Sequence, residues 1–214
     1  IYYDELDEEG QQLLITPIGG FCYEANRFQR LPLPPVPYYI KDWLPKQGKC
    51  LIYAPAKAGK STLAVQIARC IGSGEPILGI PTNAGKVLYI QLELGTEILQ
   101  ARLNATGQDY ENVFVGTSFS IKLDKSAGQR QLITALDAIE PNVLIVDPLY
   151  KTISGDENEA SDMRLICDFI DEQVIEVFNC SVIIFHHPGK DLSRGGRGSS
   201  IMEDWVDSYI EMKR

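Results

Sequence analysis

The sequence predicts an α/β protein in which a mostly parallel, twisted sheet has helices on both faces and follows a short N-terminal extension. Two observations lead to this class. From Lys49 onward, short apolar runs alternate with stretches of helical periodicity, which is the element order of a parallel sheet with crossover helices. The runs at 143–147 and 181–186 are almost continuously apolar, as expected for strands buried on both faces. With 214 residues, 44% of them hydrophobic, the chain is long enough for one such core.

The N-terminal region differs from the rest in composition. Its first residues are acidic, and Gly19-Gly20 lies between two short β-like runs at 13–15 and 21–23, which favours a hairpin. The stretch LPLPPVP at 31–37 forms neither a helix nor a central strand, and predicts a stiff extended connector. We expect an extension with its connector over 1–37 and the α/β domain over 38–214. The extension either covers a sheet edge or is an arm that packs on an adjacent protomer.

The α/β domain is expected to contain six strands joined by amphipathic helices. The candidate strands are 50–54, 87–92, 113–115, 143–147, 181–186 and 206–212. Between them, apolar residues recur at three-to-four spacing, over 63–71, 132–139 and, in the longest helix, 163–174.

Composition argues against several classes of protein. A formal charge of −9 argues against a surface that binds nucleic acid throughout, so such a site has to be local. No apolar run approaches the ~20 residues that cross a bilayer, and the acidic start is the reverse of a signal peptide. The cysteines form no C-x-x-C pair and are typical of buried thiols in a reducing compartment. They are Cys22, Cys50, Cys70, Cys167 and Cys180. We expect a cytoplasmic protein that does not bind membranes.

The first strand of the α/β domain runs into a phosphate-binding loop, PAKAGKST at 55–62, followed by an amphipathic helix. In such a loop the backbone N–H groups face the phosphates of a nucleotide, Lys60 adds a positive charge, and the Ser61 hydroxyl ligates Mg²⁺. We therefore expect ATP and Mg²⁺ as ligands. The expected nucleotide-binding residues are Ala56, Lys57, Ala58, Gly59, Lys60, Ser61 and Thr62.

The loop departs from the pattern G-x-x-x-x-G-K-[ST] at its first position, where this chain has Ala54. Because a methyl group is small, we expect a slightly altered loop that still binds nucleotide. The alternative is a Gly-Lys-Ser turn that arose by chance.

Two further apolar strands lead to carboxylates. The strand at 143–147 ends at Asp147, and ligands bind at the carboxyl ends of parallel strands, so Asp147 is expected to hold Mg²⁺ through water. The alternative is an Asp that initiates a turn before Pro148. The strand at 87–92 leads to Glu93, which can polarise the attacking water or can simply be an acid favoured at a helix N-terminus.

From about residue 43 to 214 the chain resembles RecA-like ATPases, and most closely the RepA-type replicative helicases of plasmids, which assemble as hexameric rings. The matching stretches are APAKAGKS at 54–61, GKVLYIQLE at 85–93, VDPL at 146–149, GDEN at 155–158, HHPGK at 186–190 and RGGRGSS at 194–200. Several separate motifs in the right order are more specific than a lone phosphate-binding loop.

The resemblance implies roles for residues around the nucleotide. It puts Glu93 in the place of the catalytic glutamate, with Lys60 also at the catalytic centre. It implies that His186 or His187 senses the γ-phosphate, and a one-residue register leaves the choice open. Without the resemblance, two adjacent histidines that end a strand are an ordinary structural feature. Arg214, helped by Lys213, corresponds to an arginine finger that reaches the neighbouring subunit's nucleotide.

The resemblance also implies that the segment 190–200 touches single-stranded DNA. Lys190, Arg194 and Arg197 lie there among glycines, which let the backbone approach phosphates. Because the segment has no aromatic residue for base stacking, its contacts are expected to be independent of sequence. The alternative is a solvated loop.

These observations predict an ATP-hydrolysing motor that forms a homo-oligomeric, hexameric ring and acts as a replicative helicase on single-stranded DNA. The main alternative is a RecA-like ATPase that does not translocate and works as a regulatory or recombination-associated switch. A third class is a small-molecule kinase, against which the chain has no arginine-rich lid segment after Asp147.

Overall fold

The computed structural model describes residues 16–55, 57–117, 121–155, 159–186 and 197–213. The chain divides into two compact units, Ile1–Pro37 and Tyr38–Arg214. The expected boundary between the extension and the α/β domain lies at the same position. Whether the extension is an edge cover or an arm stays a prediction.

The first unit contains little regular structure among its described residues. Ile18 and Cys22 form an antiparallel bridge around Gly19 and Gly20, whose positive φ angles of 63° and 85° suit glycine. The helix α2, Ala25–Phe28, follows. The other half of the expected hairpin, 13–15, lies outside the described residues. No described residue of this unit is buried, and Cys22 is exposed. The expectation of buried cysteines is wrong for Cys22 and confirmed for the other four.

The second unit is built on a six-stranded sheet of order β5-β4-β6-β7-β3-β8, in which every pair of neighbours is parallel. The strands are β3 Lys49–Tyr53, β4 Val87–Gln91, β5 Val113–Gly116, β6 Val143–Asp147, β7 Ser181–His186 and β8 Ser208–Glu211. All six expected strands form, and the last is shorter than expected. A small antiparallel pair that the sequence did not predict, β1 Tyr38–Ile40 and β2 Leu44–Pro45, precedes them.

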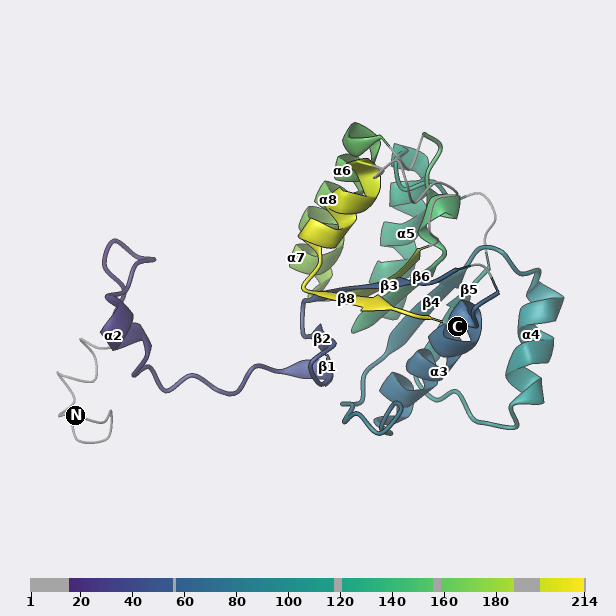
Figure 1. Ribbon diagram of the computed structural model, residues 1–214, viewed down its shortest axis with the longest axis horizontal. Helices are drawn as coiled ribbons and strands as arrows, with labels where there is room; N and C mark the ends of the chain where they lie inside the picture. Colours follow the sequence, from purple (N-terminus) through teal and green to yellow (C-terminus); the bar gives the residue numbers. More distant parts are fainter. Residues whose placement is uncertain (1–15, 56, 118–120, 156–158, 187–196, 214) are drawn as a thin grey trace. The chain divides into compact units, whose positions relative to one another are not determined.

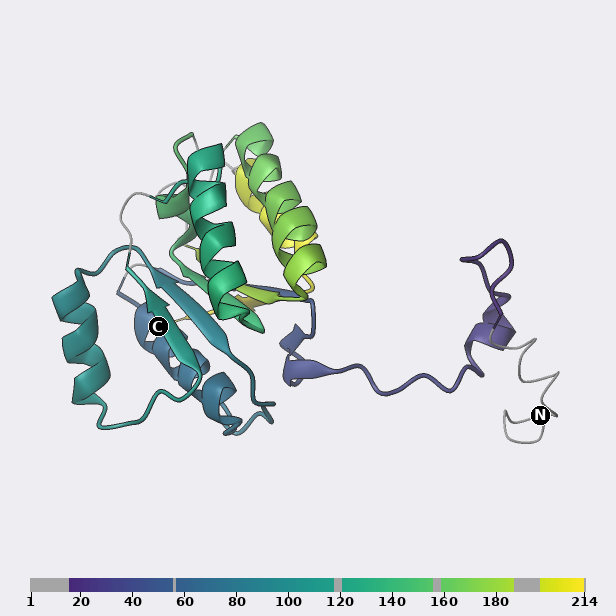
Figure 2. The ribbon, with the colours of Figure 1, turned by 180° about the vertical axis from the view of Figure 1, so that it is seen from behind.

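Helices cover both faces of the sheet (Figures 1 and 2). One face packs against α3, Lys60–Ser73, and α4, Thr96–Ala105. The other packs against α5 Ser126–Ile139, α6 Ala160–Phe169, a π-helical segment η3 Ile170–Ile175, α7 Glu176–Phe178 and α8 Arg197–Trp205. None of the helices in the described ranges has the length and hydropathy of a membrane span.

Alternation along the strands divides the core into two layers. In β6, Val143 and Ile145 pack on the α3 side, whereas Leu144 and Val146 pack on the opposite side with α5 and α6. Because side chains of a strand alternate between faces, Asp147 follows Val143 and Ile145 onto the α3 side. The same alternation puts Tyr89 of β4 on that side.

Candidate active site

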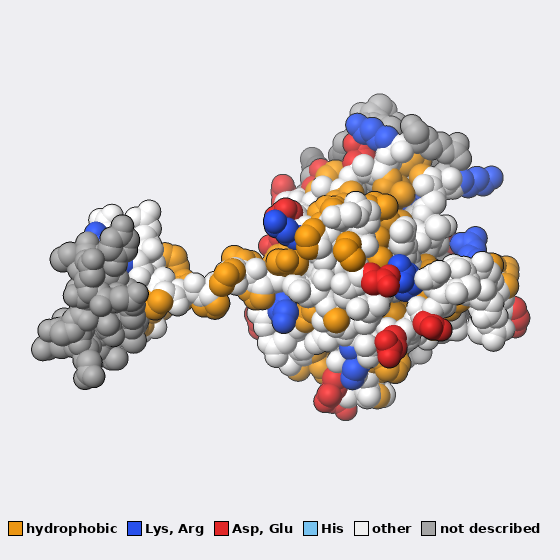
Figure 3. All heavy atoms as spheres, turned by 90° about the horizontal axis from the view of Figure 1, so that it is seen from below, with side chains coloured by type: hydrophobic (Ala, Val, Ile, Leu, Met, Phe, Trp, Pro, Cys, Tyr) orange, Lys and Arg blue, Asp and Glu red, His pale blue; other side chains and the backbone are white. Residues whose placement is uncertain are grey.

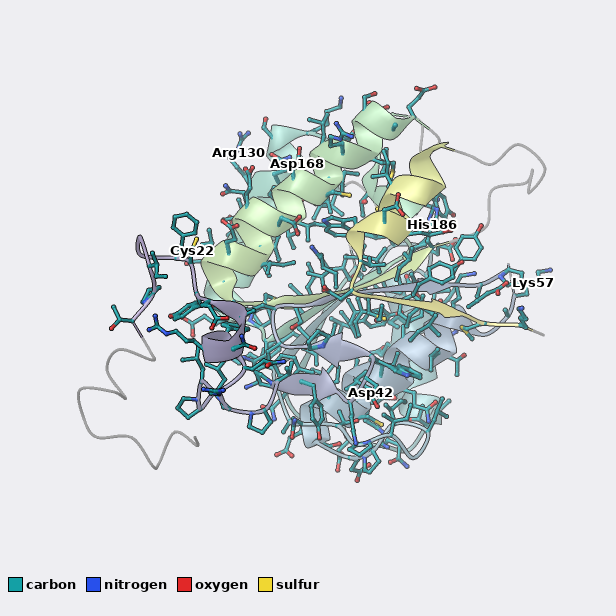
Figure 4. The ribbon with its side chains drawn as sticks, turned by 60° about the vertical axis from the view of Figure 1, so that its left-hand side comes forward. Cys22, Asp42, Lys57, Arg130, Asp168 and His186 are labelled. Atoms are coloured by element: carbon teal, nitrogen blue, oxygen red, sulfur yellow. The ribbon has the colours of Figure 1, made fainter. Side chains whose placement is uncertain are left out.

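Four strand ends meet at one edge of the sheet. Because β3, β4, β6 and β7 are parallel neighbours, their carboxyl ends lie together, and this edge is where open α/β sheets bind ligands. Tyr53 is in register with His186, and Gln91 with Asp147. Strand β7 lies between the phosphate-binding loop after β3 and the strand that carries Asp147. In Figure 4, Lys57 and His186 both lie toward the sheet end at which the arrow of β8 points.

The phosphate-binding loop depends on left-handed backbone at two residues. Lys57 has a φ of 62°, and Gly59, the N-cap of α3, has a φ of 91°. A Cβ atom at Gly59 would meet nothing within 4 Å, so the need for glycine comes from the backbone conformation. Ala54 is not among the non-glycine residues with positive φ, which explains why alanine is tolerated where the usual pattern has glycine. Ala56 lies outside the described residues.

The loop lysine points back over the loop. Lys60 is 6% exposed, and its Nζ donates to the carbonyl oxygens of Ala54, at 2.8 Å, and Pro55, at 3.0 Å. Burial lowers the pKa of Lys60, while Asp147 and Glu93 act in the opposite direction by raising it. The ammonium group thus interacts electrostatically with both carboxylates. A bound phosphate is a stronger acceptor for this ammonium than two neutral carbonyls, because the hydrogen bond is then charge-assisted on both sides.

Asp147 is completely buried at the end of β6. Its Oδ2 accepts a hydrogen bond from the Tyr89 hydroxyl at 3.0 Å, whereas its Oδ1 has no hydrogen-bond partner among the described residues. Burial raises the pKa of Asp147, and interactions with Ser61 and Tyr89 partly offset this effect.

These two oxygen donors fit a magnesium ion. Ser61 at the start of α3 and Asp147 at the end of β6 approach each other from different elements. Mg²⁺ prefers oxygen ligands and keeps several of its waters, so a buried carboxylate oxygen that lacks a partner is a suitable acceptor for a metal-bound water.

Glu93 is held by residues that the sequence analysis did not single out. The Tyr150 hydroxyl donates to Glu93 Oε1 at 2.7 Å, and Gln91 Oε1 accepts from the backbone N–H groups of Glu93 and Leu94 at 2.9 and 2.6 Å. Tyr150 belongs to a 3₁₀ helix, η2, Leu149–Thr152, which begins two residues after Asp147. One signal for Gln91 was present in the sequence, since a buried strand that ends in an amide needs a partner for it.

Of the two histidines, only His186 lies within the described residues. His186 ends β7, is 5% exposed, and has its ring 5.8 Å from that of Tyr53. Alternation along β7 puts His186 with Val182 and Ile184, on the face opposite α3 and Asp147. His187 lies outside the described residues, so the choice between the two as the phosphate sensor stays a prediction.

The residues expected to contact DNA or a neighbouring subunit fall largely outside the described ranges. This applies to Lys190, Arg194 and Arg214. Arg197 is the first residue of α8. Lys213, the expected helper of Arg214, makes an exposed ion pair of 3.2 Å with Glu211, which contributes little to stability.

Comparisons with known proteins agree with this architecture. A sequence model of the family described as AAA domain matches residues 22–193, which is more than half of the chain. The crystal structure of the KaiC-like protein PH0186 from the hyperthermophilic archaeon Pyrococcus horikoshii OT3 is similar, with a TM-score of 0.60 and 16% sequence identity. The match covers 83% of this chain and 81% of that chain. At this identity the likeness shows the fold, and the predicted α/β class with its RecA-like sheet is confirmed.

Proposed function

The chain belongs to the AAA domain family and has a RecA-like fold, and on this basis we propose that it binds ATP with Mg²⁺ and hydrolyses it at the edge formed by β3, β4 and β6. One observation carries the proposal. The phosphate-binding loop after β3 lies at the same sheet edge as Asp147, which ends β6, and Glu93, which follows β4, and both carboxylates act to raise the pKa of Lys60.

Each residue has a distinct task in the proposed reaction. The backbone N–H groups at the start of α3 and the Lys60 ammonium bind the β- and γ-phosphates. Ser61 and Asp147 hold Mg²⁺, which when bound offsets negative charge on the phosphate oxygens. Glu93 accepts a proton from water as the water oxygen bonds to the γ-phosphorus and the β–γ bridging oxygen leaves with ADP.

The proposal is tested by ATP turnover of the whole chain and two variants. Lys60→Ala is expected to abolish turnover, because it removes the charge that holds the phosphates. Glu93→Gln is expected to bind ATP but to lower kcat by about 10²- to 10⁴-fold, the usual contribution of a general base. Turnover that survives Lys60→Ala would show that this site is not the catalytic one.

For the biological role, we propose a ring-forming replicative helicase that acts on single-stranded DNA. Support comes from the six motifs in order and from the three cations at 190, 194 and 197. On the face shown in Figure 3, acidic and basic side chains are interspersed, which agrees with a DNA contact confined to one segment. Single-stranded DNA is then expected to raise ATP turnover, and Arg194→Ala combined with Arg197→Ala to abolish the rise while basal turnover remains.

A second candidate is an ATPase switch that changes its assembly and does not move along DNA. The formal charge of −9 favours it, because a strongly acidic chain repels a polyanion. In this case turnover is indifferent to DNA, and ATP changes the oligomeric state measured by light scattering.

A further inference from the structure

Glu93 is held at two points, at its side chain and at its backbone. The Tyr150 hydroxyl donates to the carboxylate at 2.7 Å, and the Gln91 side chain accepts from the backbone N–H groups of Glu93 and Leu94. Glu93 follows β4 by two residues and is exposed, so without these bonds its side chain would sample several rotamers. Tyr150 of η2 therefore holds the carboxylate of Glu93, and Gln91 at the end of β4 holds its backbone.

Tyr150 is itself on a rigid support. Leu149 and Thr152 of η2 are buried, and the Thr152 hydroxyl donates to the Leu149 carbonyl at 2.7 Å. From outside η2, the Leu123 N–H donates to the Thr152 carbonyl at 2.7 Å. Lys122 Nζ donates to the carbonyls of Lys151 and Ile153 at 2.7 and 2.8 Å. A hydroxyl carried by an element with this many anchors has a defined position, which is what preorganisation of a catalytic group requires.

The side-chain amide of Gln91 also carries a hydrogen-bond donor, Nε2, next to the same site. Its Oε1 accepts from two backbone N–H groups, which fixes the orientation of the amide and leaves Nε2 pointing elsewhere. Nε2 is buried and has no hydrogen-bond partner among the described residues. Gln91 is in register with Asp147 on the neighbouring strand. An oxygen ligand bound between these strand ends would satisfy the donor.

We propose that Tyr150 is a positioning residue for Glu93 and that Gln91 fixes the backbone beneath it. The inference rests on the proposed ATP hydrolysis. A carboxylate offers about four acceptor sites, so a hydrogen bond from Tyr150 orients Glu93 without using up its capacity to accept a proton from water. Tyr150 keeps its own proton throughout. Its contribution is to hold Glu93 in the geometry in which the proton is transferred.

The test is Tyr150→Phe in the whole chain, which removes one hydroxyl and keeps the ring. We expect kcat to fall about tenfold, the equivalent of about 1.4 kcal/mol, with KM and the Kd for ATP within about twofold of the wild type. Tyr110→Phe is the matched control, because the Tyr110 hydroxyl bonds to Thr106 on an exposed part of the chain. Its kcat is expected to equal that of the wild type.

A double-mutant cycle shows whether Tyr150 acts through Glu93. If it does, Tyr150→Phe adds little further loss in the background of Glu93→Ala, because the group that it positions is already gone. Equal losses in both backgrounds would overturn the proposal, and so would an unchanged or raised kcat in Tyr150→Phe.

The proposed function fails by a different outcome, which is turnover that is insensitive to Lys60→Ala and Glu93→Gln. The proposed role of Gln91 is tested by Gln91→Leu, which removes the acceptor for the N–H groups of Glu93 and Leu94. We expect a lower kcat in this variant, because the backbone that carries Glu93 is no longer held. An unchanged kcat in Gln91→Leu would overturn the role assigned to Gln91.

Discussion

At the scale of single residues, the burial of Asp147 lowers the stability of the nucleotide-free protein. Asp147 is fully buried, and one of its oxygens has no partner among the described residues. A buried acceptor without a partner costs about 1–3 kcal/mol. The cation that compensates this cost is the one the site is expected to bind, so stability and ligand binding oppose each other at this residue.

The effect of Asp147 on stability can be measured as a function of pH. Burial raises the pKa of Asp147 above its ordinary value of 3.8, so the native state binds the proton more tightly than the unfolded state. This contribution to stability is present below pH 3.8 and is lost as pH rises through the native pKa. We therefore expect Asp147→Asn to raise the Tm of the nucleotide-free protein at pH 7 by roughly 2–4 °C, or about 1 kcal/mol.

The rise in Tm of Asp147→Asn should vanish at pH values below the ordinary carboxyl pKa. ATP with Mg²⁺ should no longer stabilise this variant. The exposed Asp137 on α5 offers a control, because Asp137→Asn removes the same charge from a solvated position. A Tm for Asp147→Asn below that of Asp137→Asn at pH 7 would contradict the argument.

The residues of the site were predicted unequally. Lys60, Ser61 and Asp147 could be predicted as candidates because their signals are local: a loop between a strand and a helix, and an acid that ends an apolar run. Tyr150 and Tyr89 were missed, because their hydrogen bonds reach Glu93 and Asp147 across 57 and 58 positions of the sequence. Such pairs depend on strand order, which hydrophobic periodicity does not contain.

At the scale of elements, the turn from β3 into α3 depends on left-handed backbone at Lys57 and Gly59. Gly59, the N-cap of α3, has a φ of 91°, a conformation that costs an L residue about 1–2 kcal/mol. The N-cap of α4, Gly95, has an ordinary φ of −62°. The two glycines occupy equivalent positions on two helices and differ in backbone conformation.

This difference gives a matched pair of variants. Gly59→Ala is expected to destabilise the protein by about 1–2 kcal/mol and to weaken ATP binding, because the loop has to move. Gly95→Ala loses only the modest preference of an N-cap for glycine over alanine, and its Cβ would make an ordinary contact of 3.5 Å. Urea denaturation and ATP titration measure both effects. Equal losses in the two variants would show that the left-handed turn is not the cause.

The helices were predicted less completely than the strands. The periodicity over 163–174 indicated one long helix, and the structure has α6 and α7 joined by the π-helical η3. The apolar face stays on one side through the wider segment, so three-to-four spacing fits either form. Only the backbone hydrogen bonds distinguish them, and these leave no signal in the side-chain pattern.

At the scale of the whole molecule, the core of the described residues belongs to the second unit. Both core layers are formed by residues of the second unit, and none of the described residues in 16–37 is buried. The sequence predicted six strands, but their order could not be predicted, because alternating strands and helices allow several arrangements of a parallel sheet.

Removal of residues 1–37 should therefore leave a folded domain. We expect residues 38–214 to melt cooperatively, with a Tm within about 4 °C of the whole chain, an allowance of roughly 1 kcal/mol. Circular dichroism and calorimetry test this expectation. A truncated chain that aggregates or loses its helical signal would show that the first unit belongs to the core. A folded chain with a changed oligomeric state would support the arm over the edge cover.

The central place of β7 has a mechanical consequence. Its hydrogen bonds join it to β3 on one side and to β6 on the other, and the chain leaves this strand at His186 toward the cations proposed to bind DNA. A pull on the chain along the axis of β7 loads both ladders in shear, so many bonds share the load together. An edge strand under the same tension has only one ladder to resist it. The strand between the phosphate loop and Asp147 is thus one of the four interior strands, β4, β6, β7 and β3, that two ladders hold against such a pull.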